Sequence, residues 1–347
     1  MTQRITLNHF EQLPPLTHLK RLTSKTGLIQ HADKEVPDPT FGYSLDDNAR
    51  AMIACLWHYK VFGDRSVLQL ADVYFSYIKR VEQKEGTFHN FLTFLETEVE
   101  NEGSEDSIGR AVWALGEIAG LHPDQASANN AKSMLERTNL DKHLSHAHLR
   151  TKAYISLGLA ASAKNAELTR WADTLVAAFE RTSHDSWQWF EDSLRYANGI
   201  FPYALAKAYQ NSGNETYLNI AQQSYRWLDS VSRERGVPAP IGQNGWFVEG
   251  RSKALYDQQP LEAADMVLAG SELYRITKDR NYLELALDWM NWYWGHNTNE
   301  LSLINEQTGG IYDALTPDGV NLNQGAESIA TFLLAYLSLS KIALSEQ

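Results

Sequence analysis

The chain has 347 residues and a formal net charge of −12, and 43% of its residues are hydrophobic. No basic run accompanies this charge, so the electrostatic footprint of a nucleic-acid-binding protein is missing. The single cysteine, Cys55, excludes a disulfide within the chain, and its apolar helical surroundings predict a small core residue. The N-terminus resembles no signal peptide and no stretch approaches 18 apolar residues, which predicts a soluble, cytoplasmic protein that does not span a membrane.

Helical periodicity dominates the chain, and the predicted helices follow one another in pairs. In chain order the pairs cover residues 47–63 with 65–83, 104–121 with 124–138, 145–163 with 165–183, 191–213 with 214–234, 257–279 with 281–296, and 324–344 with an N-terminal helix within 16–32. Residues 85–104 are predicted to form a short β-like segment between helices. Long loops with glycine and proline cover residues 235–256 and 297–321.

One helix of each pair is apolar nearly all round, as in "RAVWALGEIAGL" and "ATFLLAYLSLSKIAL", whereas its partner carries charge on one face. A helix that is apolar all round is buried. Helices without alternating strands exclude a doubly wound α/β sheet. The sequence therefore predicts an all-α (α/α)6 barrel, a six-hairpin toroid with short β excursions in its loops. We expect residues 1–347 to form a single domain.

Most of the predicted inner helices begin with carboxylates. Three acidic starts are followed by an arginine on the same helix face: Asp46 and Asp47 by Arg50, Asp106 by Arg110, and Asp192 by Arg195. Such residues could simply cap helices and complement the helix dipole. However, parallel inner helices would bring these starts together at one mouth, as an active site requires. The candidate catalytic residues are therefore Asp47, Glu105, Asp106, Glu191, Asp192 and Asp257.

Further polar and aromatic residues lie at or near the same helix starts. Amide, hydroxyl and carboxylate groups beside aromatic rings suit the recognition of sugar hydroxyls. In loops rich in Gly, Asn and Asp, however, such residues can also be present because they favour turns. The candidate substrate-binding residues are His31, Tyr43, Arg50, Arg110, Tyr196, Asn198, Asn244, Trp246, Gln258, Gln259, Glu262, Asp313, Asn323 and Glu327. His146 and His148 are two residues apart and point away from each other on a helix, so we expect no metal and no cofactor.

Five segments, among them "QHADKEVPDPTFGYSLDDNARA", "EDSLRYANGIFPYAL" and "YDQQPLEAADMV", give the chain a family resemblance from about Gly27 to its end. It resembles the six-hairpin glycosidase-like domains found alone in bacteria or fused behind retaining glycosyltransferases. The resemblance implies an (α/α)6 toroid, carbohydrate chemistry with a lean to mannosides, and a glycosyltransferase as a partner.

The function expected from these features is hydrolysis of an oligosaccharide or polysaccharide. Glycosidases of this architecture typically invert, with acid and base carboxylates about 6.5–9.5 Å apart, a gap that suits residues across the mouth. Crowded acids would raise the pKa of one of them, which would supply the general acid. The alternatives are a sugar epimerase working through His31, His146 or His148, a polysaccharide lyase, and a non-catalytic carbohydrate-binding module.

Overall fold

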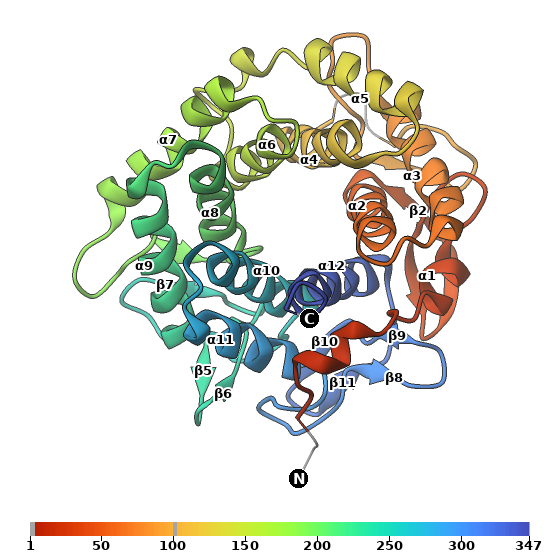
Figure 1. Cartoon of the computed structure of the whole chain (residues 1–347). Helices are drawn as coiled ribbons and strands as arrows, with labels where there is room; N and C mark the ends of the chain where they lie inside the picture. Colours follow the sequence, from red (N-terminus) through yellow and green to blue (C-terminus); the bar gives the residue numbers. More distant parts are fainter. Residues whose placement is uncertain (1–3, 100–102, 347) are drawn as a thin grey trace.

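The computed structural model describes residues 4–99 and 103–346, and its helices form two concentric rings (Figure 1). The inner ring consists of α2 (Leu45–Phe62), α4 (Glu105–Leu121), α6 (Leu149–Ala161), α8 (Ile200–Ser212), α10 (Pro260–Thr277) and α12 (Ala326–Ala343). Each inner helix packs against the next in this order, and α12 packs against α2, which closes the ring.

The outer ring consists of α3 (Leu68–Val81), α5 (Gln125–Arg137), α7 (Asn165–Thr182), α9 (Glu215–Val231) and α11 (Arg280–Asn291), each packed on the inner helix before it. The N-terminal segments η1 (Leu7–Glu11) and α1 (Thr17–Leu22) pack on α12. The (α/α)6 fold predicted from the sequence is confirmed. The N-terminal helix is shorter than predicted, because residues 29–33 pair in a sheet.

Helix α12 shows why the inner helices are apolar all round. By length and composition it could cross a membrane, which corrects the expectation that no segment approaches that limit. In this fold 89% of it is buried among its neighbours, as an inner barrel helix requires. Glu327 and Lys341, near its two ends, are the residues of α12 that are not fully buried. They mark the two ends of the barrel.

Short strands tie together the segments that precede inner helices. They are β1 (Ile29–Asp33), β2 (Val36–Ser44), β3 (Phe91–Leu92), β4 (Ser193–Leu194), β5 (Arg233–Glu234), β6 (Val237–Pro238), β7 (Phe247–Val248), β8 (Ile304–Asn305), β9 (Gly310–Ile311), β10 (Ala314–Thr316) and β11 (Gly319–Asn321). Strand β2 leads directly into α2 and pairs with β1 and β3, while β10 and β11 pair just before α12. Residues 100–102 of the predicted β excursion lie outside the described residues.

One predicted helix start is wrong. The sequence predicts a helix from residue 191, but α8 begins at Ile200. The reason is the pairing of Ser193 and Leu194 with Val248 and Phe247, which holds this stretch extended. Glu191 and Asp192 therefore do not lie at the start of an inner helix.

Glycines of α4 and α6 let these two inner helices approach each other closely. A Cβ atom at Gly116 would overlap the backbone of Gly158, and one at Gly158 would overlap the carbonyl oxygen of Val112. The two backbones therefore touch directly, and a methyl group at either position would force the ring apart.

We predict that Gly158→Ala lowers the free energy of unfolding by about 3 kcal/mol, because overpacking outweighs the gain in helix propensity. Gly109→Ala is the matched control, since its Cβ would lie 3.1 Å from Thr151 and would need only a small adjustment. Urea denaturation measures both variants. Equal stability of Gly158→Ala and the wild type would contradict this packing.

Candidate active site

A cavity of about 640 Å³ lies at the N-terminal ends of α2 and α12 and beside the segment that leads into α10. We call it the N-terminal cavity. Its lining residues are Gln30, His31, Ser44, Asp46, Asp47, Phe91, Gln243, Asp257, Gln259, Asp313, Ala314, Thr316, Asn321, Gly325, Glu327 and Ser328. The structure thus brings together six residues predicted from the sequence: Asp47, Asp257, His31, Gln259, Asp313 and Glu327.

A second hollow of about 400 Å³ shares His31, Asp313 and Asn321 with this cavity and includes the predicted residue Asn323. The Asp313 carboxylate is held by the backbone N–H of Gly325 and the hydroxyl of Ser328, both at 2.7 Å. The two hollows therefore adjoin at the Asp313 carboxylate, which is held in place, and together form one extended site.

Two buried arginine side chains, each only 1% exposed, pair with carboxylates that line the N-terminal cavity. The guanidinium of Arg50 lies 2.9 Å from Asp46 and 3.0 Å from Glu327. Arg110 lies 3.2 Å from the same Asp46 carboxylate and packs on the ring of Tyr154. The predicted pairing of Asp46 with Arg50 is therefore present, and two buried cations face two carboxylates.

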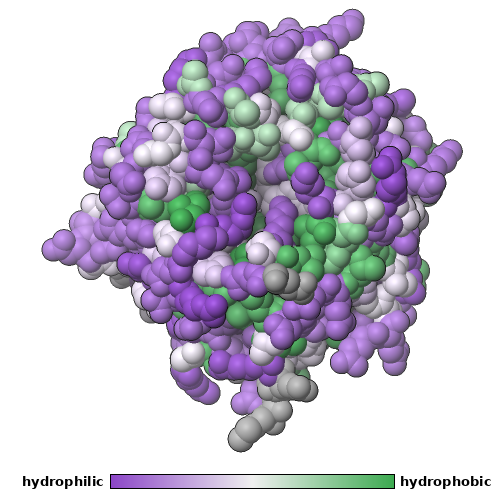
Figure 2. Space-filling view, in the orientation of Figure 1, coloured by the Kyte–Doolittle hydropathy of each residue, from purple (hydrophilic) through white to green (hydrophobic). Residues whose placement is uncertain are grey.

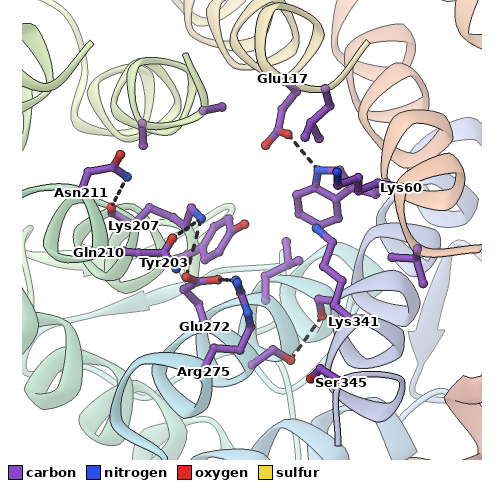
Figure 3. A pocket seen from close by; sticks show the side chains of 18 of the residues that line it. Lys60, Glu117, Tyr203, Lys207, Gln210, Asn211, Glu272, Arg275, Lys341 and Ser345 are labelled. Atoms are coloured by element: carbon purple, nitrogen blue, oxygen red, sulfur yellow. Dashed lines mark hydrogen bonds and ion pairs between the residues drawn. The ribbon is translucent and has the colours of Figure 1, made fainter. Parts of the chain in front are cut away.

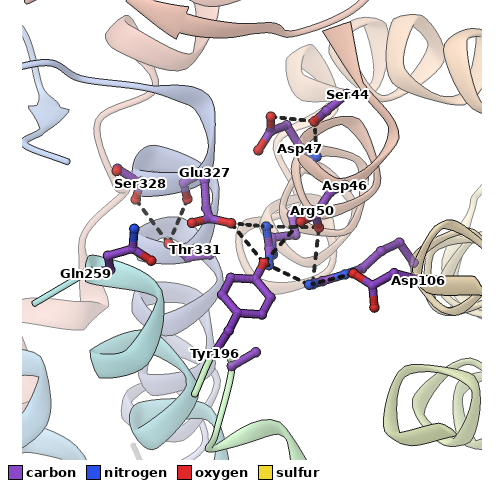
Figure 4. Close-up of polar contacts among 12 residues, drawn as sticks. Ser44, Asp46, Asp47, Arg50, Asp106, Tyr196, Gln259, Glu327, Ser328 and Thr331 are labelled. Atoms are coloured by element: carbon purple, nitrogen blue, oxygen red, sulfur yellow. Dashed lines mark hydrogen bonds and ion pairs between the residues drawn. The ribbon is translucent and has the colours of Figure 1, made fainter. Parts of the chain in front are cut away.

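The hydroxyl of Tyr196 lies at the centre of this cluster (Figure 4). It accepts hydrogen bonds from Arg50 at 3.0 Å and Arg110 at 2.9 Å. Its own proton can go to Glu327 at 3.0 Å or to Asp46 at 3.3 Å. Tyr196 does not line the cavity; it fixes the carboxylates that do.

Asp47 differs sharply from its neighbour Asp46. It is 4% exposed, and the hydroxyl of Ser44 donates to its carboxyl group at 2.5 Å while accepting its backbone N–H at 3.0 Å. Burial, together with the negative charges of Asp46 and Glu327, raises the pKa of Asp47 to about 8. The cavity therefore holds a protonated carboxyl group next to an ion-paired carboxylate.

Glu262 and Asn198, predicted as sugar ligands, instead shape the loop that carries Tyr196. The buried Glu262 carboxylate accepts the backbone N–H of Ala197 at 2.6 Å and the side-chain amide of Asn198 at 2.8 Å. Ala197 has a φ of +50°, a backbone conformation that costs energy for a residue with a Cβ. The Glu262 contacts stabilise this turn, so both residues position Tyr196.

Two further predicted ligands have side chains that are buried and bonded to protein. The hydroxyl of Tyr43 pairs with that of Ser24 at 2.8 Å. The Gln258 side chain accepts from the Trp292 indole at 3.0 Å and donates to the Leu255 carbonyl at 2.9 Å. Their residue types suit sugar binding, but tertiary packing uses them as structural links.

Four predicted catalytic acids lie outside the cavity lining. Glu191 is paired with Arg150 at 2.7 Å, and Glu105 lies 3.5 Å from His146. Asp106 is half exposed and 3.9 Å from Arg110. Asp192 is exposed and accepts from the hydroxyl of Ser193 rather than pairing with Arg195. The acids at the start of α4 complement the dipole of that helix, and those before α8 belong to a loop.

The predicted residues Asn244 and Trp246 also lie outside the cavity, in an exposed turn. The Trp246 ring faces the Arg195 guanidinium at 5.3 Å. Among the lining residues that were not predicted are Asp46, Ser44, Phe91 and Ser328. The capping pattern of Ser44 and Asp47 was the one sequence signal for this group, since the position of Phe91 depends on strand pairing. Within residues 4–99 and 103–346, no three His, Cys, Asp or Glu side chains gather to hold a metal ion.

The sequence matches no protein-family model and no curated protein, whereas many solved structures share its fold. Cellobiose 2-epimerase from Bacillus thermoamylovorans matches with a TM-score of 0.74 and 13% identity, over 97% of this chain and 98% of that one. D-mannose isomerase matches with a TM-score of 0.73 and 13% identity, over 97% of each chain.

A third similar structure is an α-1,6-mannanase of glycoside hydrolase family 76 from Salegentibacter, with a TM-score of 0.66 and 14% identity over 97% of this chain and 100% of that one. It is a variant inactivated by replacing two consecutive aspartates with alanine, in complex with an α-1,6-linked mannose tetramer. At these identities the likeness establishes the (α/α)6 barrel architecture.

We predict that Asp47 makes the stability of the protein depend on pH. In the folded chain Asp47 keeps its proton up to about pH 8, whereas in the unfolded chain an aspartate loses its proton near pH 4. The stabilisation from this group is therefore fully present below about pH 4 and is lost as pH rises through about 8. Thermal unfolding of Asp47→Asn should show the variant gaining stability over the wild type between about pH 5 and about pH 8. Asp192→Asn is the control, and parallel curves for wild type and Asp47→Asn would contradict the assignment.

Proposed function

We propose that the protein is a glycoside hydrolase that cleaves mannosides, with Asp47 as general acid and Asp46 as its ionised partner. The observation that carries the proposal is the pair itself. Asp46 and Asp47 are the only two consecutive aspartates in the sequence, and both line the N-terminal cavity. Asp46 faces two arginines, whereas burial raises the pKa of Asp47. Glycoside hydrolysis requires such a pair of carboxyl groups in opposite protonation states.

The mannanase comparison supports both the residues and the substrate class. That protein loses activity when two consecutive aspartates are replaced, and it binds an α-1,6-linked mannose tetramer. The present chain carries its one such pair at the start of an inner helix, facing a cavity. We therefore take α-1,6-linked mannose oligomers as the first substrates to test.

The composition of the cavity suits a sugar chain. Gln30, Gln243 and Gln259 offer amides that can both donate to and accept from sugar hydroxyls. Phe91 is 38% exposed and gives the cavity an aromatic face. The adjoining hollow around Asp313 and Asn323 extends the site beyond the volume of one sugar ring. These features favour an oligosaccharide over a monosaccharide substrate.

The proposed reaction begins when Asp47 gives its proton to the oxygen of the glycosidic bond. The bond from the anomeric carbon to that oxygen breaks while Asp46 forms a bond to the same carbon, and the shortened sugar leaves as an alcohol. Asp46 then carries an ester and no negative charge. Because the charge of Asp46 is one cause of the raised pKa of Asp47, its loss lowers that pKa and prepares Asp47 to act as a base. Asp47 takes a proton from water, which attacks the anomeric carbon and restores Asp46.

This scheme retains the anomeric configuration, in place of the inversion expected from the sequence. Inversion needs a base about 6.5–9.5 Å from the acid. Of the predicted partners, Asp106 and Asp192 do not line the cavity, whereas Asp257 does. Retaining enzymes instead use two carboxyl groups about 5–5.5 Å apart, and the proposal assigns these two roles to the neighbouring Asp46 and Asp47. Asp257, Asp313 and Glu327 are the cavity carboxylates that an inverting reaction would use as the base.

A sugar epimerase is the second candidate. The epimerase and isomerase structures match with higher TM-scores than the mannanase, at 0.74 and 0.73 against 0.66. The epimerase hypothesis requires histidine bases, and His31 is the one histidine among the residues lining the N-terminal cavity. His146 and His148 are exposed and lie outside it. The cavity thus offers several carboxyl groups but one histidine, which favours hydrolysis over epimerisation.

We predict that Asp46→Asn and Asp47→Asn each lower kcat/KM on α-1,6-linked mannose oligomers by roughly a thousandfold, because each removes a group needed in the transition state. Asp192→Asn, an exposed acid outside the cavity, should stay close to the wild type. NMR of the freshly formed product measures both the rate and the anomer, and we expect retention.

Inverted product with both variants inactive would move the base to Asp257, Asp313 or Glu327. A changed sugar with an intact glycosidic bond would replace the hydrolase proposal by the epimerase. Full activity of both variants would contradict the role of the aspartate pair.

A further inference from the structure

A further cavity, of about 570 Å³, lies at the opposite end of the barrel from the Asp46–Asp47 pair. Figure 3 shows side chains that line it. We call it the C-terminal cavity, because all six inner helices contribute residues from near their C-terminal ends. They include Trp57 and Lys60 of α2, Glu117 of α4, Ala160 of α6, Lys207 of α8, Glu272 and Arg275 of α10, and Lys341 of α12. Tyr203, from the first turn of α8, also lines the cavity. Figure 2 shows the molecule hollowed at the centre of the ring. The proposed hydrolysis does not use this space.

The C-terminal cavity is lined by an excess of positive charge, whereas the chain as a whole is negatively charged. Four cationic side chains line it against two carboxylates, although the chain as a whole carries −12. Both carboxylates already have partners. Glu117 accepts the Trp57 indole N–H at 3.0 Å, and Glu272 lies 2.7 Å from Arg275 and 3.6 Å from Lys207. The cavity is left with an excess of positive charge.

Lys341 is the most unusual of these cations. Its ammonium lies 3.4 Å from the centre of the Trp57 ring (Figure 3). Within the described part of the chain this ammonium makes no hydrogen bond and no ion pair, although it faces a polar cavity. Burial lowers the pKa of Lys341 to about 7.

Cations in the last turn of a helix commonly offset its dipole by approaching the final carbonyl groups. Lys341 does not do so, because its ammonium is directed over an indole ring and bonds to no carbonyl group among residues 4–99 and 103–346. Helix stabilisation therefore does not account for its position. A partly buried cation with no carboxylate paired to it is costly, which favours a ligand that supplies the missing negative charge.

We propose that the C-terminal cavity binds a small organic anion, about the size of a monosaccharide that carries one phosphate or carboxylate group. The anionic group lies against Lys341, with Lys207 and Arg275 at its edge. The rings of Trp57 and Tyr203 face the body of the ligand. Gln210, Asn211 and Ser345 line the same cavity and offer partners for hydroxyl groups.

Binding of an anion beside Lys341 favours its charged form, so the affinity should fall as pH rises above about 7. The other titratable groups facing the cavity are Lys60, Glu117, Tyr203, Lys207, Glu272 and Arg275. Free side chains of these types do not change charge near neutral pH. The pH dependence therefore reports on Lys341.

Isothermal titration calorimetry of the full chain tests the proposal with glucose 6-phosphate, glucuronate and neutral glucose. The wild type should bind at least one of the two anions saturably, and the neutral sugar should not compete with it. Lys341→Gln should weaken binding roughly tenfold to hundredfold, as expected for the loss of a hydrogen bond to a charged group. Lys79→Gln is the matched control, because Lys79 lies 4.8 Å over the Phe75 ring on α3, outside the cavity.

The pH series uses whichever anion binds, above about pH 7, where both anions keep a constant charge. The wild type should lose affinity there, whereas Lys341→Arg should keep it, because arginine stays charged. The proposal fails if neither anion binds saturably, if Lys341→Gln binds as well as the wild type, or if Lys341→Arg follows the wild-type pH profile. If Lys341→Gln does not fold, the comparison of pH profiles between Lys341→Arg and the wild type still tests the proposal. The relative affinities of the two anions identify the charged group.

Discussion

The N-terminal end of the barrel is organised by two buried arginine guanidinium groups that must be neutralised. Removing a cation from water is costly unless opposite charges and hydrogen-bond acceptors surround it. The charges of Arg50 and Arg110 are balanced by the Asp46 carboxylate that they share, and Arg50 also pairs with Glu327 from the far end of the chain. The same two arginines donate to the Tyr196 hydroxyl, whose loop Glu262 holds in place. One electrostatic cluster thus joins α2, α4 and α12 with the loop before α8.

This cluster also explains why two adjacent aspartates have different chemistry. Asp46 is turned toward the arginines, whereas Asp47 is buried, bonded to Ser44 and exposed to the negative charge of Asp46 and Glu327. The arginines act mainly on the first carboxylate, and the second keeps its proton. The difference between proton donor and carboxylate therefore follows from the packing of the inner helices before any substrate arrives.

The sequence predicted the features that repeat along the chain. Apolar inner helices, charged outer helices and the four-residue spacing of Asp46 and Arg50 are local patterns, and the structure confirms them. The start of α8 could not be predicted, because it depends on strand pairing between residues more than fifty positions apart. Residue type does not report burial, so the sequence also suggests Tyr43, Gln258 and Glu262 as ligands, although the structure buries all three side chains. The C-terminal cavity went unpredicted because Trp57 and Lys341 look like an ordinary core residue and a helix-end cation in the sequence.

The proposed reaction requires Asp47 to hold its proton at neutral pH, and NMR of protein labelled with ¹³C at the aspartate carboxyl carbons measures this directly. Comparison with Asp47→Asn assigns the signal. We expect the Asp47 carboxyl carbon to titrate at about pH 8. A midpoint near 4, the ordinary value for aspartate, would contradict this expectation and remove the general acid from the proposed reaction.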